Sequence, residues 1–230
     1  MKLGSGLNAI RSTILAHAAT PETERKERLH KWPVVTISRE AGTNASEVTT
    51  ELVRLLSERD DPKNPWQKYD SELVNRVAED HDLSEHLIAA VQERDKSWIE
   101  HFAAGLTSTP TDIEIAMKIA KTIRGIAAVG RAVIVGRGGQ AILNGVPQVI
   151  HVRLRAPVEW RVQQHAESHK LDIEKAREEV SRIDNERTRF VKNHFNRDPH
   201  DPDLYDLIIN MKQVDVKQAA RVILTLVPKP

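Results

Sequence analysis

The chain has 230 residues, with 34 Lys and Arg against 33 Asp and Glu, so its formal net charge is +1. This balance argues against a protein that binds nucleic acid polymers through bulk positive charge. The sequence contains no cysteine, which excludes a disulfide framework, a cysteine-ligated zinc site and a thiol nucleophile. No segment approaches the about 18 apolar residues of a membrane span, and no secretory signal follows Lys2. We therefore expect a cytoplasmic globular protein without a membrane partner.

Residues 1–32 predict a helical arm that precedes the main domain. Its apolar side chains recur at helical spacing and form one stripe, made of Leu3, Leu7, Ile10 and Ile14. A second, highly charged helix is expected to begin at Thr20-Pro21. Helices this short need a surface to pack against. The arm therefore packs on its own chain or exchanges with a second copy, and exchange would produce a homodimer.

From residue 33 to residue 230, short β-branched runs alternate with amphipathic segments. Strands are predicted over residues 34–38, 66–69, 132–135, 149–154 and 206–210. Helices are predicted over residues 45–59, from about 70, and over 84–104, 112–129, 157–169, 172–193 and 215–226. Such alternation is typical of βαβ units, so we predict one α/β domain with a mostly parallel sheet and helices on both faces.

The first predicted strand leads into a polar turn, Ser38–Ser46, and then into a helix. Ligands of open α/β sheets bind beyond the carboxyl ends of the strands. Free backbone N–H groups and the helix dipole converge at such a turn, which is the layout of a phosphate cradle. The signature G-x-x-x-x-G-K-[ST] is absent, however, and no Gly-Lys dipeptide occurs in the chain. An ordinary strand-to-helix turn with a solvated Ser46 remains the alternative.

The third predicted strand ends in a second glycine-rich turn, Gly136–Ala141, which matches G-x-G-x-x-A. A dinucleotide site would require an acidic residue at the end of the next strand, but that strand ends in Arg153-Leu154-Arg155. We therefore favour a tight turn that presents one charged side chain, Arg137, at the edge of the sheet.

Eight arginines fall between residues 151 and 200, together with nine acidic residues. Intrahelical ion pairs on a solvated, permanently docked helix would explain this composition. The functional alternative is a mobile lid whose guanidinium groups clamp phosphate oxygens, with hinges at Ser168–Lys170 and Asn196–Pro202. The helix over 172–192 has a thin apolar stripe, which favours mobility without ligand.

His165 and His169 are four residues apart, a spacing that can hold zinc. No H-E-x-x-H pattern completes the ligand set, and the predicted helix is strongly polar. We therefore expect surface histidines rather than a metal site.

Several short motifs coincide along the chain: V-T-I-S-R-E-x-G at 35–42, Tyr69-Asp70, V-G-R-G-G at 135–139, R-A-P-x-E-x-R at 155–161, R-x-D-x-x-R at 182–187 and Y-D-L-I-I-N at 205–210. Over about residues 33–228 the sequence resembles the cytidylate-kinase-like family, a branch of the P-loop nucleoside monophosphate (NMP) kinases. The resemblance implies a five-stranded parallel sheet, an NMP-binding helical region within about 70–130 and a lid around 160–195.

The resemblance also implies phosphoryl transfer from ATP with Mg²⁺ to a nucleoside monophosphate, with a pyrimidine nucleotide as the expected acceptor. The implied phosphate loop comprises Ser38, Gly42, Thr43, Asn44, Ala45 and Ser46. In this arrangement Arg39 would bind the donor phosphates and Arg137 the acceptor phosphate. The charge of the transition state would be neutralised by Arg182, Arg187 and Arg161. Asp184 would face the nucleotide from the lid. Magnesium would be held by Ser46, Glu40 or Asp70.

The sequence departs from the family in its phosphate loop. Gly42-Thr43-Asn44-Ala45 stands where the family usually has G-S-G-G, and the third strand ends in Gly136 instead of an aspartate. Because glycine allows close approach of the backbone to phosphate, this eroded loop keeps an alternative function open. The alternative is a non-catalytic nucleotide-binding or protein-interaction module on a kinase-like scaffold.

Overall fold

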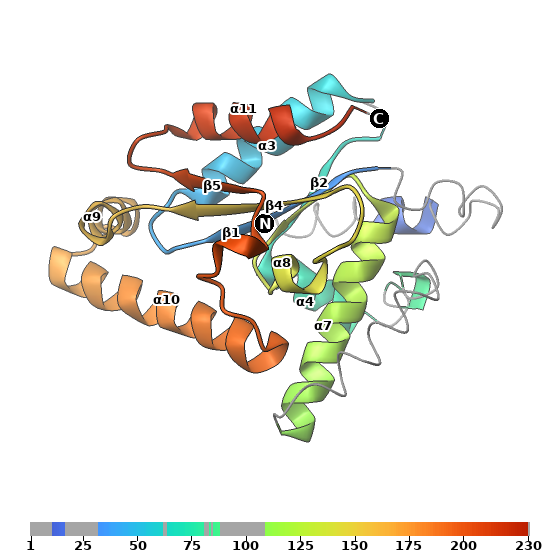
Figure 1. Cartoon of the computed structure of the whole chain (residues 1–230), viewed down its shortest axis with the longest axis horizontal. Helices are drawn as coiled ribbons and strands as arrows, with labels where there is room; N and C mark the ends of the chain where they lie inside the picture. Colours follow the sequence, from blue (N-terminus) through green and yellow to red (C-terminus); the bar gives the residue numbers. More distant parts are fainter. Residues whose placement is uncertain are drawn as a thin grey trace.

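The computed structural model describes residues 11–16, 32–61, 64–80, 83, 85–87 and 109–229. Within them, one sheet of five strands has the order β2-β3-β1-β4-β5, and every pair is parallel. The strands are β1 (Val34–Arg39), β2 (Gln67–Tyr69), β3 (Ala132–Val135), β4 (Val149–Arg155) and β5 (Leu207–Asn210). Helices lie on both faces of the sheet (Figure 1). The predicted α/β fold with a five-stranded parallel sheet is confirmed.

The helices of the described residues follow the strands in the expected alternation. They are α3 (Ala45–Arg59), α4 (Ser71–Glu79), α7 (Pro110–Val129), α8 (Gly139–Ile142), α9 (Val158–His169), α10 (Ile173–Phe195) and α11 (Val216–Leu226), with a 3₁₀ turn at Pro202–Leu204. Most of the helix predicted over 84–104 lies outside the described residues. None of the helices that the structure describes is long and apolar enough to cross a membrane.

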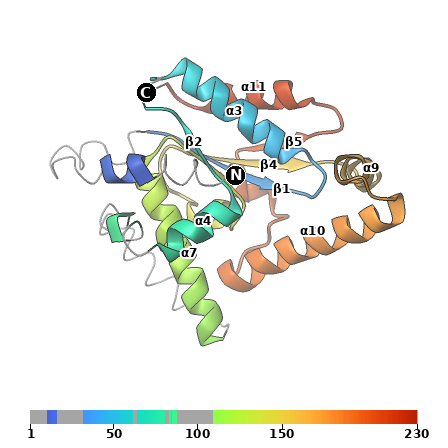
Figure 2. The ribbon, with the colours of Figure 1, turned by 180° about the vertical axis from the view of Figure 1, so that it is seen from behind.

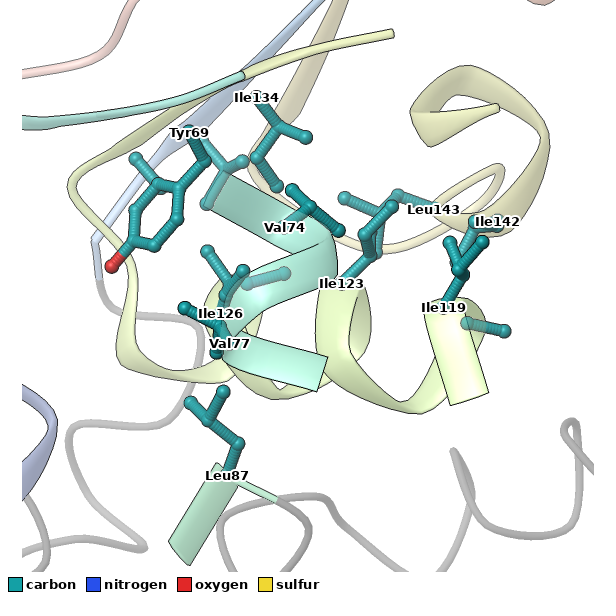
Figure 3. Close-up of a cluster of buried hydrophobic side chains, with 14 of the residues drawn as sticks. Tyr69, Val74, Val77, Leu87, Ile119, Ile123, Ile126, Ile134, Ile142 and Leu143 are labelled. Atoms are coloured by element: carbon teal, nitrogen blue, oxygen red, sulfur yellow. The ribbon is translucent and has the colours of Figure 1, made fainter. Parts of the chain in front are cut away.

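Two apolar layers enclose the sheet, because successive strand residues point to opposite faces. On one face, Val35 and Ile37 of β1 pack with Leu52 of α3 and Ile223 of α11. The other face carries the cluster of Figure 3, in which Ile134 of β3 lies near side chains of α4, α7 and α8. Seen from behind in Figure 2, α3 and α11 lie on one side of the sheet and α4 and α7 lie on the other.

Of the predicted N-terminal stripe, only Ile14 falls within the described residues. Residues 11–16 are helical, and the Ile14 side chain is buried in the core cluster of its own chain. This contact agrees with packing in cis at that position. Leu3, Leu7 and Ile10 lie outside the described residues, and the homodimer stays a prediction.

Helices α9 and α10 occupy the range predicted for the lid and pack against each other. Their shared apolar cluster is small and consists of Ala41, Val162, Ala166, Ala176 and Val180. The prediction of a surface position is wrong for His165, which is buried and whose Nε2 lies 2.9 Å from Glu179 Oε2. The helix turns this ring toward α10, and hydropathy of the sequence does not reveal that contact. His169 is exposed, as expected.

Candidate functional site

The carboxyl end of β1 continues into the β1–α3 loop, residues 40–44, whose backbone turns through two left-handed residues, Gly42 and Asn44. Gly42 has a φ of 75°, and a β-carbon at this position would overlap the carbonyl oxygen of Arg161. Asn44 is left-handed, with a φ of 53°, and precedes α3 without capping it through its side chain. The first N–H groups of α3 therefore have no side-chain cap, and they are the groups that bind anions at helix N-termini.

Two cavities adjoin this loop, and both contain Arg39, Glu40 and Arg187 in their walls. The loop cavity, of about 530 Å³, lies over the loop and its other lining residues include Gly42, Asn44, Ser46, Lys68, Asp70 and His169. The turn cavity, of about 430 Å³, lies beside the β3–α8 turn and its other lining residues include Ser38, Ser71, Arg137, Gln140, Arg153 and His200. Each volume is in the range of small-molecule sites.

Three arginines at these cavities form an arginine cluster: Arg39 and Arg187 line both cavities, and Arg137 lines the turn cavity. Burial first, then the charges of Arg187 and Arg137, lower the pKa of the Arg39 guanidinium to about 9. Burial likewise lowers the pKa of Arg137 and of Arg187. Among the residues that the structure describes, none forms an ion pair with these three side chains. Asp70 acts on Arg39, and Asp184 and Glu186 act on Arg187, as more distant charges. Within the described residues the cluster is therefore a concentration of positive charge with no direct ion pair.

Gly136 makes room for the first member of this cluster. It directly follows β3 and has a φ of 78°, and a β-carbon there would overlap Nη1 of Arg39. The next residue, Arg137, extends from the turn, where its Nε lies 3.4 Å from the carbonyl oxygen of Ser71 and its guanidinium lies over the Phe190 ring. The predicted tight turn with one charged side chain is thus present, and it delivers that charge to the turn cavity.

Glu40 forms ion pairs with two arginines outside this cluster, Arg153 and Arg161. Its Oε1 lies 3.6 Å from Nη2 of Arg153, and its Oε2 lies 3.3 Å from Nε of Arg161. The same Oε2 accepts a hydrogen bond from the backbone N–H of Ala156 at 3.1 Å. This carboxylate therefore has a structural role at the loop.

Asp184 and Arg161 join the lid candidate to the loop. Asp184 Oδ2 accepts a hydrogen bond from Arg161 Nη1 at 2.6 Å, and its Oδ1 accepts one from the Ala41 N–H at 2.7 Å. Arg187, one helical turn later, faces the cavities and approaches the carbonyl oxygen of Arg39. Arg182 lies apart from them, with 59% of its side chain exposed and an ion pair to Glu186.

Arg153 is a site residue that the sequence analysis did not select. It is buried on β4, in register with Ser38 of β1, and it donates hydrogen bonds to the carbonyl oxygen of Pro199 and to Tyr205 Oη. It shares a face of the sheet with His151, whose Nδ1 lies 2.7 Å from Thr36 Oγ1. The sequence did contain a signal for this site, because His151 and Arg153 are polar residues at alternate positions of an otherwise apolar strand.

The three predicted magnesium ligands differ in how well they fit a metal. Glu40 does not fit, because two arginines and one N–H already surround its carboxylate. Ser46 Oγ accepts a hydrogen bond from Lys68 Nζ at 3.1 Å. Asp70 fits best: one oxygen caps α4 through the Leu73 N–H, and the residue lines the loop cavity. In the described part of the chain, no group of three or more His, Cys, Asp or Glu residues is arranged for a metal.

The sequence matches the cytidylate kinase-like family over residues 34–213, more than three quarters of the chain. The chain belongs to the cytidylate kinase-like family. This cytidylate kinase-like protein thus combines a kinase-like scaffold with the loop, cavities and arginine cluster described above. No protein among those with curated descriptions matches it.

A solved structure with the same fold supports this assignment of the scaffold. It is the crystal structure of an uncharacterized protein from Eubacterium ventriosum ATCC 27560, which superposes with a TM-score of 0.65 at 22% sequence identity. The match covers 85% of the present chain and 97% of the other. At this identity the likeness shows the fold alone.

Proposed function

We propose that this cytidylate kinase-like protein transfers the terminal phosphoryl group of MgATP to a nucleoside monophosphate, with a pyrimidine nucleotide as the expected acceptor. The observation that carries the proposal is the arginine cluster: Arg39 and Arg187 line both cavities, Arg137 lines the turn cavity, and no carboxylate of the described residues forms a direct ion pair with them. Burying such charges is unfavourable for the protein alone. It is favourable for a ligand that brings several phosphate oxygens.

In this proposal the donor triphosphate binds in the loop cavity. The first turn of α3 and its dipole attract the phosphates, and Arg39 approaches them from the carboxyl end of β1. Asp70 would hold magnesium through water, and the metal when bound neutralises phosphate charge and orients the donor. Glu40 and Arg161 keep the loop in place from behind.

The acceptor nucleotide binds in the turn cavity, where Arg137 pairs with its phosphate. A phosphate oxygen of the acceptor attacks the γ-phosphorus of the donor, and the bond from that phosphorus to the β–γ bridging oxygen breaks. Arg39 and Arg187 border both cavities, so they neutralise the charge on the transferring group while both substrates are held in line. No proton transfer to or from a protein side chain is required.

The alternative proposal is a nucleotide-binding module without catalysis. Two observations favour it: the loop has no lysine of its own, and Asp184 already occupies the Ala41 N–H that a phosphate would use. A family and a fold do not by themselves establish chemistry.

Calorimetric titration with ATP and with the common nucleoside monophosphates, each with and without Mg²⁺, distinguishes the two proposals when paired with a turnover assay. Binding of donor and acceptor together with turnover supports the phosphotransferase. ATP binding without turnover for any acceptor supports the non-catalytic module. An absence of any nucleotide binding rejects both and leaves a protein-interaction scaffold.

A further inference from the structure

The β1–α3 loop keeps the hydroxyl of the phosphate-loop signature and a left-handed backbone at its second glycine position, but it lacks the first glycine, where Arg39 stands, and the lysine. When G-x-x-x-x-G-K-[ST] is laid over residues 39–46, Asn44 takes the second glycine position and Ser46 takes the hydroxyl position. The left-handed backbone of Asn44 suits a glycine position. Ala45 falls at the lysine, so the loop lacks the ammonium that reaches the β- and γ-phosphates.

An ammonium group from another strand lies at this loop. Lys68 belongs to β2, and its Nζ donates a hydrogen bond to Ser46 Oγ at 3.1 Å. Its neighbour Tyr69 is buried in the cluster on the α4 and α7 face of the sheet. Because strand side chains alternate between faces, Lys68 points to the opposite face, where α3 begins. Lys68 therefore lines the loop cavity.

Nothing in the described residues neutralises the Lys68 ammonium, since no carboxylate forms an ion pair with it. Within the described residues its ammonium donates a hydrogen bond only to a neutral hydroxyl, which leaves two of its three N–H donors for a ligand. A lysine on an edge strand also discourages pairing with other sheets, and β2 is an edge strand. A role at the strand edge alone would require neither the contact of Lys68 with Ser46 nor its position in the wall of the loop cavity.

We propose that Lys68 supplies the ammonium that the β1–α3 loop lacks and binds the terminal phosphates of a polyphosphate donor. The inference rests on the proposed function, and it assigns the phosphate-binding lysine of the loop to β2. The charge reaches the loop from β2, which is separated from β1 by β3, instead of from within the loop. Lys68 and Arg39 then approach the same phosphates from β2 and β1.

The test compares Lys68→Gln with Lys217→Gln, a control that removes an exposed lysine of α11 outside both cavities. Affinities for ATP, for inorganic tripolyphosphate and for CMP are measured by calorimetry with full-length protein. Loss of a charge-assisted phosphate contact weakens ATP and tripolyphosphate binding about tenfold or more. CMP binding stays unchanged, because the acceptor lies in the turn cavity. Lys217→Gln leaves all three affinities unchanged.

Three results would overturn the inference, and they separate it from the proposed function. If Lys68→Gln binds ATP and tripolyphosphate like the wild type, the lysine serves only the strand edge while the proposed function stands. Equal weakening of ATP and CMP would show a general disturbance of the site and would also reject the assignment. If the wild-type protein binds neither nucleotide nor tripolyphosphate, both the inference and the proposed function are wrong.

Discussion

Asp184 accepts a hydrogen bond of 2.7 Å from the backbone N–H of Ala41, so α10 is tied directly to the β1–α3 loop. The second oxygen of Asp184 binds Arg161 at 2.6 Å, and Arg161 also donates to the Ala41 carbonyl oxygen. The loop is thus held on both sides by the range of residues predicted to form a lid. Any motion of α10 changes the groups that surround the loop.

The first prediction concerns this motion. Against α9 the buried apolar residues of α10 are only Ala176 and Val180, whereas Val191 and Phe195 anchor its C-terminal end in the main core. The N-terminal part of α10 therefore belongs to the weakly packed part of the fold. We expect amide hydrogen exchange over 173–195 to slow when a bisubstrate analogue is bound, because phosphates engage Arg187 and close the helix over the site.

The exchange of α11 serves as the internal control, since this helix packs on α3 away from both cavities. It should exchange at the same rate with and without the analogue. Equal protection of α10 in the two states would show a permanently docked helix and reject the lid.

A second prediction uses two arginines of the same helix. Arg187 borders both cavities, whereas Arg182 is exposed and pairs with Glu186. Arg187→Ala should lower turnover by about 10³-fold, the effect of removing an arginine that stabilises charge during phosphoryl transfer. Arg182→Ala removes a surface ion pair worth about 0–1 kcal/mol and should leave turnover nearly unchanged. Thermal unfolding of both variants checks that neither effect arises from stability.

Similar losses of turnover in the two variants would contradict this assignment. They would restore Arg182 to the role that the family resemblance implies for it. The comparison is matched, because both substitutions remove one guanidinium group from α10.

A third prediction follows from the charge of Arg39. Burial lowers its pKa in the folded protein to about 9, well below the ordinary range of an arginine, so the charged form is disfavoured by folding at neutral pH. Arg39→Gln removes this charge. We expect the free energy of unfolding at pH 7 to rise by about 1 kcal/mol, or Tm by about 2–4 °C, while ATP affinity falls at least about tenfold.

The same pKa predicts a pH dependence of binding. A bound phosphate favours the protonated guanidinium, so ATP affinity should be full below pH 9 and fall as the pH rises through about 9. Arg39→Gln should abolish that decline. An affinity of the wild type that stays level to pH 10 would show that Arg39 does not lose its proton in this range and would contradict the predicted pH dependence.

A fourth prediction compares two glycines with similar backbones. Gly136 has a φ of 78° and Gly145 a φ of 73°, but only at Gly136 would a β-carbon overlap another group, Nη1 of Arg39. Each change to alanine costs about 1–2 kcal/mol of stability, because both positions are left-handed. Gly136→Ala should also displace Arg39 and weaken ATP binding about tenfold.

Denaturant unfolding and calorimetry of the two variants measure these effects. If Gly145→Ala weakens ATP binding as strongly as Gly136→Ala, the loss comes from general strain and not from the position of Arg39.

The sequence predicts the central strands well because they are short runs rich in buried β-branched residues, as in Val34–Arg39 and Ala132–Val135. Arg39 and Arg137 can also be located from the sequence, because Arg39 is the last residue of β1 and Arg137 lies in the turn after β3. The strands and these two arginines depend on residues that are close together in the sequence. Hydrophobic periodicity and turn residues are therefore sufficient to predict them.

The contributions of Lys68, Arg153 and His165 could not be predicted in the same way. Lys68 reaches Ser46 only because β2 lies beside β3 at the edge of the sheet, and Arg153 meets Ser38 only through the register of β4 with β1. His165 is buried by α10, which follows it in sequence. Each contact depends on tertiary placement that hydropathy and motif spacing do not encode.

Turnover is the most direct test of the central claim, that the arginine cluster joins a donor site to an acceptor site for phosphoryl transfer. A coupled assay measures ADP formation from MgATP with each common nucleoside monophosphate as acceptor, and Arg187→Ala protein sets the background. The account predicts acceptor-dependent ADP formation by the wild type, well above that background, for at least one pyrimidine nucleotide. If no acceptor raises ADP formation above the Arg187→Ala background, the claim of phosphoryl transfer is wrong.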